Sequence, residues 1–243
     1  MSVNTILTII AVGFLGISLV CFLLKSQISK KISYVSLFLA IVLLAINPMI
    51  NSTQGKLPPK AEFVKSQDKL PSCYIGGGEG EWGERAIAKK HTKPFHKVLE
   101  LGGGAGSVSA IIQEKLVDPT RHVVVQPDER KMGFGGFKQL MKNKKACNFK
   151  FTAIDHILTA ADVQPIIKIL GGKPNCLVVD CENCLVGEYE KNPELFDEVE
   201  MIQVERDDFD GSYTKLFDKL GFIKTDQGYG CNGNCPTEVW EKP

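Results

Sequence analysis

A glycine-rich segment, Glu100-Leu-Gly-Gly-Gly-Ala-Gly106, follows a short apolar run and precedes an apolar pattern of helical spacing. Glycines permit a tight turn and close approach of a ligand to the backbone, and the free N–H groups of a following helix attract an anionic group. The dinucleotide pattern Gly-x-Gly-x-x-Gly/Ala fails, because Ser107 and Ser109 occupy its third position in the two possible frames. The Gly-Lys-Ser/Thr of a Walker loop is also absent. The segment therefore predicts a cofactor loop of another kind.

Acidic residues stand at the ends of two later apolar runs. Asp180 and Glu182 follow the run at 176–179, and Glu205 ends the run at 201–205. A carboxylate in such a place can bind or deprotonate an acceptor hydroxyl, so Asp180 and Glu182 are candidate catalytic residues and Glu205 a candidate for the same pocket. The alternative for Asp180 and Glu182 is capping of the next helix or pairing with a lysine. His156 is a third candidate base, or a cofactor-side residue, because its ordinary pKa is about 6.5.

Two cysteine pairs, Cys181-x-x-Cys184 and Cys231-x3-Cys235, are spaced like zinc ligands. A four-cysteine zinc site requires both pairs within a few ångströms, whereas the pairs belong to different turns, so we expect no metal. A local disulfide between Cys231 and Cys235 is an alternative to free thiols, which we expect for the rest, because cysteine usage alone does not define the redox compartment.

The elements that must position these residues alternate along the chain. Short apolar runs predict strands at 97–101, 122–126, 149–154, 176–180 and 201–205. The tail predicts two more strands, at 222–227 and 237–242, around a turn rich in glycine and asparagine. Apolar residues at helical spacing predict helices over 108–116, from about 127 to 142, near 187–196 and over 212–220, the last one stopping at Gly221. Alternation of this kind predicts an α/β fold with a doubly wound, mostly parallel sheet and an antiparallel last strand. The segment around Glu81 and Trp82 is expected to be a lid or a surface loop.

The glycine segment resembles motif I of class I S-adenosylmethionine (SAM) methyltransferases, acidic-x-Gly-x-Gly-x-Gly, through Glu100, Gly102, Gly104 and Gly106. Within that superfamily the chain resembles FkbM-type methyltransferases over roughly residues 74–243. The matching stretches are Val125-Gln-Pro-Asp128, Val179-Asp-Cys-Glu-Asn-Cys184, Gln203-Val-Glu205 and Leu220-Gly-Phe222.

The resemblance implies a Rossmann-like, seven-stranded fold and SAM as the cofactor. It implies that Glu100 orients the methionine amino group, that the glycine loop lies against the cofactor, and that Ala153, Ile154 and Asp155 lie near adenine. The family has an acidic residue for the ribose hydroxyls where this chain has Gln126, which lacks the charge of a carboxylate, and Asp128 is a possible substitute. Asn183 also stands where the family has glycine.

The implied function is SAM-dependent O-methylation of a small-molecule, sugar or lipid-linked acceptor. Gln126 keeps open a catalytically degenerate binding or scaffold protein of the same fold. A cysteine-based metal or redox module and a nicotinamide oxidoreductase are further alternatives, the last disfavoured by the missing third glycine.

The first fifty residues differ in kind from the remainder. They carry three lysines and no acidic residue, and the uncharged runs 3–24 and 32–50 are each long enough to cross a bilayer. We expect residues 1–50 to form a two-helix membrane anchor, 51–72 a linker and 73–243 the globular domain. The basic loop Lys25–Lys31 favours a cytoplasmic loop, but Lys56, Lys60 and Lys65 nearly balance it, so the membrane side stays open.

The charge of the remaining chain excludes one class of partner. Residues 51–243 hold 26 basic and 28 acidic side chains, a net charge of −2. Tracking of a phosphate backbone needs an excess of lysine and arginine, so we expect no nucleic-acid partner.

Overall fold

The structure is a computed structural model that describes residues 69–78, 80–127, 136–208, 210–230 and 235–243. All of them belong to the second of the two units into which the chain divides, residues 58–243. In the described part of the chain, no helix combines the length and the hydropathy that crossing a membrane requires. The two expected spans, 3–24 and 32–50, and most of the expected linker lie outside the described residues.

The elements alternate much as the apolar runs predict. The strands are β1 (Val98–Leu101), β2 (His122–Val125), β3 (Thr152–Ile154), β4 (Cys176–Val179), β5 (Met201–Glu205), β6 (Ile223–Gly230) and β7 (Cys235–Glu241). The helices are α3 (Trp82–His91), α4 (Ser107–Lys115), α5 (Gly136–Cys147), α6 (Ala160–Leu170), α7 (Leu185–Lys191) and α8 (Ser212–Leu220), with a 3-10 turn η1 (Pro193–Phe196).

The strands form one seven-stranded sheet in the order β3-β2-β1-β4-β5-β7-β6. Strands β3, β2, β1, β4 and β5 are parallel, whereas β7 runs antiparallel to both β5 and β6. The predicted mostly parallel sheet with an antiparallel last strand is therefore confirmed. The strands β1, β2, β4 and β5 are buried along their whole length, as expected for apolar strands covered on both faces.

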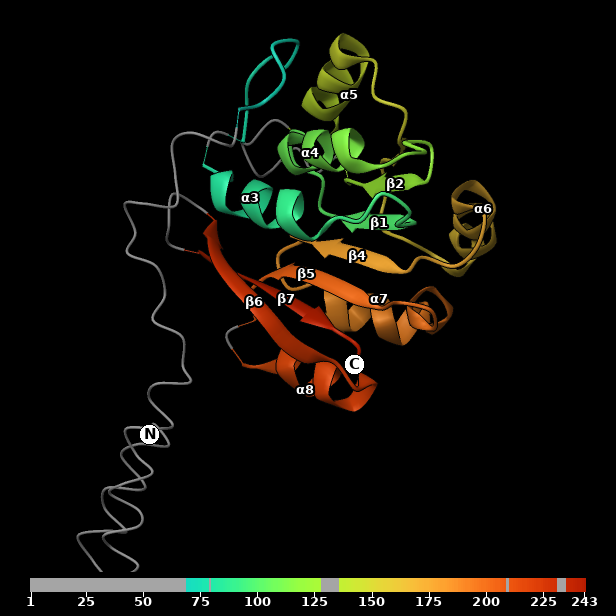
Figure 1. Ribbon diagram of the computed structural model, residues 1–243. Coiled ribbons are helices and arrows are strands. Elements are labelled where there is room, and N and C mark those ends of the chain that lie inside the picture. Colours follow the sequence, from blue (N-terminus) through green and yellow to red (C-terminus); the bar gives the residue numbers. More distant parts are fainter. Residues whose placement is uncertain (1–68, 79, 128–135, 209, 231–234) are drawn as a thin grey trace, which may run out of the picture. The chain divides into compact units, whose positions relative to one another are not determined.

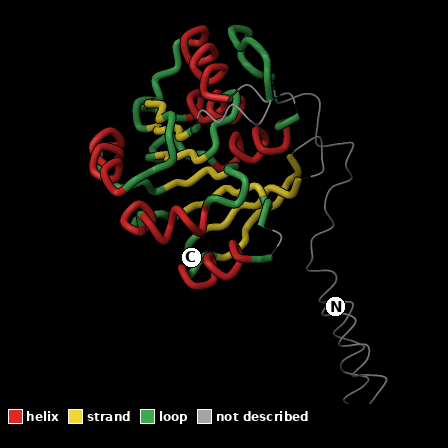
Figure 2. Tube along the Cα trace, turned by 180° about the vertical axis from the view of Figure 1, so that it is seen from behind, coloured by secondary structure: helices red, strands yellow, loops and turns green. Residues whose placement is uncertain are grey.

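Helices pack on both faces of this sheet (Figure 1, Figure 2). Alternate residues of each strand point to opposite faces, which divides the core in two. On one face, Leu99, Leu177 and Ile202 pack with side chains of α6, α7 and α8. On the other face, Val98 and Val178 pack with α3 and α4, and α5 covers β2 through Leu140.

Two helices are absent from the sequence-based prediction. Helix α3 occupies 82–91, after a glycine-rich stretch for which a lid or surface loop was expected. Helix α6 contains Pro165, which argues against a helix in a sequence, but Asp162 accepts a hydrogen bond from the Thr159 backbone N–H and Gly171 ends the helix at φ 68°. These start and stop signals outweigh the cost of one proline inside the helix.

Candidate functional site

The carboxyl ends of four parallel strands are level with one another. Leu101 of β1 pairs with Val125 of β2 and Val179 of β4, and Val179 pairs with Val204 of β5. The residues that follow these positions, Gly102, Gln126, Asp180 and Glu205, must therefore lie along one edge of the sheet. Ligands of open α/β sheets bind at this edge.

The glycine loop between β1 and α4 needs its glycines for two physical reasons. Gly102, Gly104 and Gly106 have φ values of 88°, 51° and 89°, a region that side chains with a Cβ rarely adopt. Gly102 also lies so close to the next loop that an added Cβ would come within 1.6 Å of the Asp180 carbonyl oxygen. The three predicted motif glycines thus form a tight loop pressed against the end of β4.

Glu100 sits under this loop in a buried hydrogen-bond network. Its Oε2 accepts hydrogen bonds from Ser109 Oγ at 2.7 Å and from His122 Nε2 at 2.8 Å. The Gln113 amide donates to His122 Nδ1 at 3.1 Å, which leaves the proton of the imidazole on Nε2. His122 and Ser109, which sequence reasoning did not select, therefore hold Glu100 in place.

A cavity opens beside the loop and collects acidic side chains from four elements. Its lining comprises Glu81, Glu84, Glu100, Gly102, Gly103, Gly104, Val108, Val178, Val179, Asp180, Gln203, Glu205 and Thr237. Five of these residues are acidic, and none of the described lining residues is basic. The cavity therefore favours a ligand that carries positive charge.

Burial raises the pKa of three of these carboxyl groups. The pKa of Glu84 rises to about 9, because it is buried and lies near Asp180 and Glu81. Burial and a hydrogen bond to Glu205 raise the pKa of Asp180 well above its usual range. Burial raises the pKa of Glu205 as well, while the hydrogen bond from Asp180 opposes that rise. Asp180 therefore holds the proton that it shares with Glu205.

The predicted ribose and adenine positions lie at the neighbouring strand ends. Gln126 turns its side chain toward the glycine loop, where its Oε1 accepts a hydrogen bond from Gly104 N at 2.7 Å. The Gln126 N–H donates to the Ile154 carbonyl, so the end of β3 with Ala153, Ile154 and Asp155 lies beside it. These four residues do not line the cavity described above. Asp128 lies outside the described residues.

Two predicted catalytic residues do not reach the cavity. Glu182 is exposed in the turn after β4, with a left-handed backbone at φ 53°. His156 is exposed beside α6 and hydrogen-bonds to Asp155 and Asp162, each at 3.2 Å. The hydrogen bond to Asp155 first, and then that to Asp162, raise the pKa of His156. Of the predicted catalytic residues, the structure brings Asp180 alone into the cavity, together with Glu205.

The cysteines differ from the expected free thiols. Cys181 and Cys184 form a disulfide, and a second disulfide joins Cys73 to Cys147. The sulfurs of Cys181 and Cys184 are bonded to each other, which rules them out as zinc ligands here. Cys235 is also disulfide-bonded, whereas Cys231 lies outside the described residues.

The segment before α3, residues 73–81, is bonded to α5 and to the start of α4, on either side of the glycine loop. Its Cys73 is bonded to α5, and the buried Asn143 of α5 accepts from Ile75 N at 2.8 Å while donating to the Ala105 carbonyl at 2.8 Å. Ser107 Oγ, at the start of α4, donates to the carboxylate of Glu81. Glu81, which sequence reasoning placed in a lid or surface loop, instead belongs to the cavity wall.

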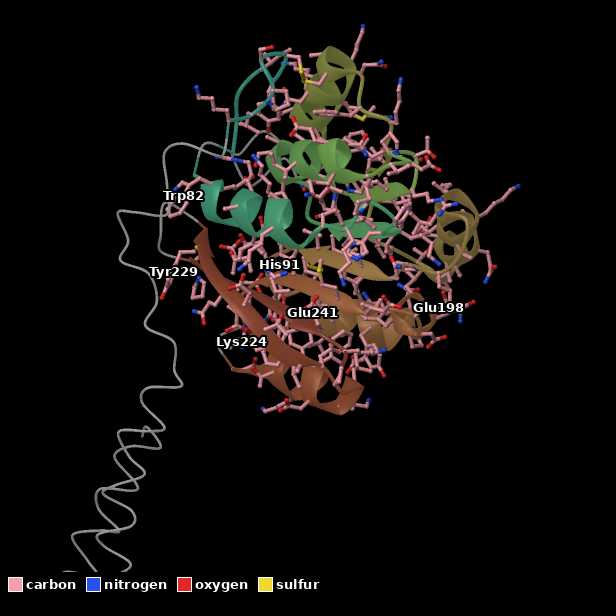
Figure 3. All side chains as sticks on the ribbon, viewed as in Figure 1. Trp82, His91, Glu198, Lys224, Tyr229 and Glu241 are labelled. Carbon is pink, nitrogen blue, oxygen red and sulfur yellow. A yellow bond between two sulfur atoms is a disulfide. The ribbon has the colours of Figure 1, made fainter. Side chains whose placement is uncertain are left out.

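Three further cavity residues, Glu84, Gln203 and Thr237, were not among the site residues predicted from the sequence. Glu84 reaches the cavity because α3 lies alongside β6, as the labelled Trp82 and Tyr229 show in Figure 3. An added Cβ on Gly83 would come within 1.5 Å of the Tyr229 carbonyl oxygen, so this approach depends on glycine. Gly83 next to an acidic residue was the available hint, but its partner strand lies more than a hundred residues away in the chain.

The comparisons with known proteins add one finding at the level of the fold. No protein-family model and no curated protein matches the chain. Solved structures do match. A candidate tRNA (m1A22) methyltransferase of Streptococcus pneumoniae, in complex with S-adenosyl-L-methionine, has a TM-score of 0.50 and 9% identity, over 65% of this chain and 72% of that one. The described domain has a methyltransferase fold.

Two more solved structures match over a similar share of the chain. An uncharacterized protein of Listeria monocytogenes serotype 4b has a TM-score of 0.51 and 6% identity, over 66% of this chain and 67% of that one. An O-methyltransferase of Bacillus cereus in complex with SAH has a TM-score of 0.47 and 14% identity, over 71% of this chain and 84% of that one. At these identities the match concerns the fold alone.

Proposed function

We propose that this methyltransferase-fold chain is a membrane-anchored, SAM-dependent methyltransferase that acts on a hydroxyl of a small-molecule, sugar or lipid-linked acceptor. One observation carries the proposal: an acidic cavity, with no basic residue in its described lining, adjoins a glycine loop at the β1–α4 turn. SAM supplies a methyl group on a positively charged sulfur and also carries an ammonium group. Both positive charges suit this cavity, and the S. pneumoniae protein of the same fold was solved with SAM bound.

The chain's own residues divide the work between binding and proton transfer. The loop from Gly102 to Gly106 presents backbone rather than side chains to a ligand. Glu100, held by Ser109 and His122, fixes one acidic wall of the cavity. Asp180 and Glu205 share a proton there, so the pair can accept the proton of an acceptor hydroxyl. Proximity and orientation of the acceptor supply most of the remaining catalysis.

Titration calorimetry of the purified full chain with SAM and with S-adenosylhomocysteine tests the proposal. We expect both to bind, and we expect Gly104→Ala to raise the Kd at least about tenfold. Gly221→Ala is the matched control. Both glycines have positive φ and no atom closer than 3.6 Å to an added Cβ, but Gly221 follows α8 and lies outside the cavity lining. Both variants therefore introduce the same kind of backbone strain, but only Gly104→Ala changes a residue of the cavity.

Two results would argue against this function in different ways. Absence of binding at millimolar SAM would refute a SAM-dependent enzyme. Binding without methyl transfer to any hydroxyl acceptor would favour a non-catalytic binding protein of this fold. The hydrogen bond from Gly104 N to Gln126 Oε1 is the observation behind that second candidate, because it occupies the side chain where the resembling family has a ribose-binding carboxylate.

We also propose that the anchor places the domain on the non-cytoplasmic side of a membrane. The lysines of the loop at 25–31 favour a cytoplasmic loop, which puts residues 51–243 on the opposite side. The Cys73–Cys147 and Cys181–Cys184 disulfides agree with that side, since disulfides persist in oxidising compartments. A net charge of −2 after residue 50 favours an uncharged or cationic acceptor over a nucleic acid.

A further inference from the structure

Three carboxylates from separate elements converge in the cavity. Glu84 comes from α3, Asp180 follows β4 and Glu205 ends β5. One carboxylate oxygen from each lies within 4.8 Å of the other two. Two ligand oxygens on opposite sides of an ion, each at about 2.4 Å, are about 4.8 Å apart, so these three oxygens can coordinate the same ion.

Three buried oxygen atoms in the same cavity have no hydrogen-bond partner among the described residues. Gln203 is 2% exposed and Thr237 fully buried, yet Gln203 Oε1 and Thr237 Oγ1 have no hydrogen-bond partner among the described residues. Glu84 Oε1, on a side chain that is 2% exposed, has none either. All three residues line the cavity. A buried oxygen without a partner costs about 1–3 kcal/mol, so three of them beside one cavity favour a ligand that these oxygens can bind.

The position of Gln203 is fixed by its other end. Its Nε2 donates to the Glu84 carbonyl at 3.2 Å, which ties β5 to α3 at the level of the cavity. The amide nitrogen is thereby used, and the amide oxygen remains as an acceptor. A set of carboxylate, amide and hydroxyl oxygens without a basic side chain among the described lining residues does not suit an anion or an apolar ligand. It suits a hard cation.

We propose that Glu84, Asp180 and Glu205 form a binding site for one divalent cation of the magnesium, manganese or calcium class. Gln203 and Thr237 line the same cavity and offer further oxygen ligands. The absence of nitrogen and sulfur donors among the described lining residues disfavours zinc and copper. Cation binding does not depend on methyl transfer. The cation takes the place of the proton that Asp180 and Glu205 share in its absence. This part rests on the proposed function: the same cation would bind the acceptor hydroxyl and lower its pKa.

Manganese is the probe of choice because its binding can be followed directly. The purified full chain is freed of metal with a chelator and titrated with Mn²⁺ alone, and free Mn²⁺ is measured by electron paramagnetic resonance. We expect one tight site per chain, from which Mg²⁺ or Ca²⁺ displaces Mn²⁺. We expect each of Glu84→Gln, Asp180→Asn and Glu205→Gln to raise the Kd at least about tenfold.

The controls separate a lost site from a lost fold. Glu114→Gln changes an exposed glutamate of α4 outside the cavity and should bind Mn²⁺ like the unaltered chain. Circular dichroism and a thermal melt check that each variant is folded, which we expect because the replacements keep side-chain size. Equal Mn²⁺ binding by the unaltered chain and the folded triple variant Glu84→Gln/Asp180→Asn/Glu205→Gln would overturn the site, as would no binding by the unaltered chain. SAM titration in chelator reports separately on the proposed function.

Discussion

His96 makes the stability of the domain dependent on pH through a single residue. Its side chain is 3% exposed, its Nδ1 accepts from Lys93 N at 3.2 Å, and its Nε2 is buried without a partner among the described residues. Burial first, and then the charge of Lys93, lower its pKa to about 4. His96 therefore stays neutral in the folded domain between about pH 6.5 and about pH 4, whereas the unfolded chain protonates it in that range.

We predict that His96 lowers the stability of the domain as the pH drops from about 6.5 to about 4, because in that range the unfolded chain protonates this histidine and the folded domain does not. The contribution of His96 to this fall is about 1–3 kcal/mol. In urea titrations at about pH 7 and about pH 5, His96→Gln should lose less stability than the unaltered chain. His156→Gln, an exposed histidine outside the cavity, should keep the full loss. Equal losses in the unaltered chain and His96→Gln would contradict the assignment.

At the level of elements, the cavity depends on how closely α3 approaches β6. The contact is made by Gly83 against the Tyr229 carbonyl, and the far end of α3 is held by His91 and Lys90, which both bind Asp226. Figure 3 shows Trp82 and His91 at the two ends of α3, beside β6. Glu84 follows Gly83 directly, so any outward shift of α3 also moves one cavity wall.

A pair of glycine-to-alanine changes tests this contact. Gly83→Ala should destabilise the domain by about 2 kcal/mol or more, because backbone must move to admit the methyl group. Gly187→Ala, inside α7 with nothing within 4 Å of its added Cβ, should stabilise it by about 0.5–1 kcal/mol through helix propensity. Chemical denaturation measures both. Similar effects of the two changes on the free energy of unfolding would contradict the close α3–β6 contact at Gly83.

For the whole molecule, the disulfides and the proposed anchor make one joint prediction. If the domain faces an oxidising compartment, Cys73 and Cys147 are bonded in the cell as they are in the structure. In sealed membrane vesicles of known orientation, protease should then reach the domain from the non-cytoplasmic side. When free thiols are alkylated before the cells are lysed, Cys73 and Cys147 should remain unlabelled, because disulfide-bonded cysteines do not react.

The same bond should matter for stability. It closes a loop across a sequence separation of 74 residues, so replacing both cysteines by serine should cost about 2–4 kcal/mol in thermal or urea unfolding. The shorter Cys181–Cys184 bond, with a separation of three, should contribute less. Fully labelled cysteines together with protease access from the cytoplasmic side would refute the proposed membrane side.

The sequence by itself determined the sheet and the loop. Apolar runs located β1, β2, β4 and β5, because strands buried on both faces must be apolar, and Gly221 marked the end of α8. The glycines at 102, 104 and 106 predicted the tight turn for a local reason, their positive φ angles. Asp180 could be selected because it follows a buried strand directly. All of these signals act over a few residues.

Only the tertiary structure decided which side chains share the cavity. Glu84 joins Asp180 and Glu205 because α3 packs against β6 through glycine, a contact between segments far apart in the chain. Glu182 and His156, chosen for their residue type, lie exposed on turns, since a chain leaving a strand can direct its side chains to solvent within two residues. The bond between Cys73 and Cys147 likewise depends on two segments meeting in space, which no local spacing reveals.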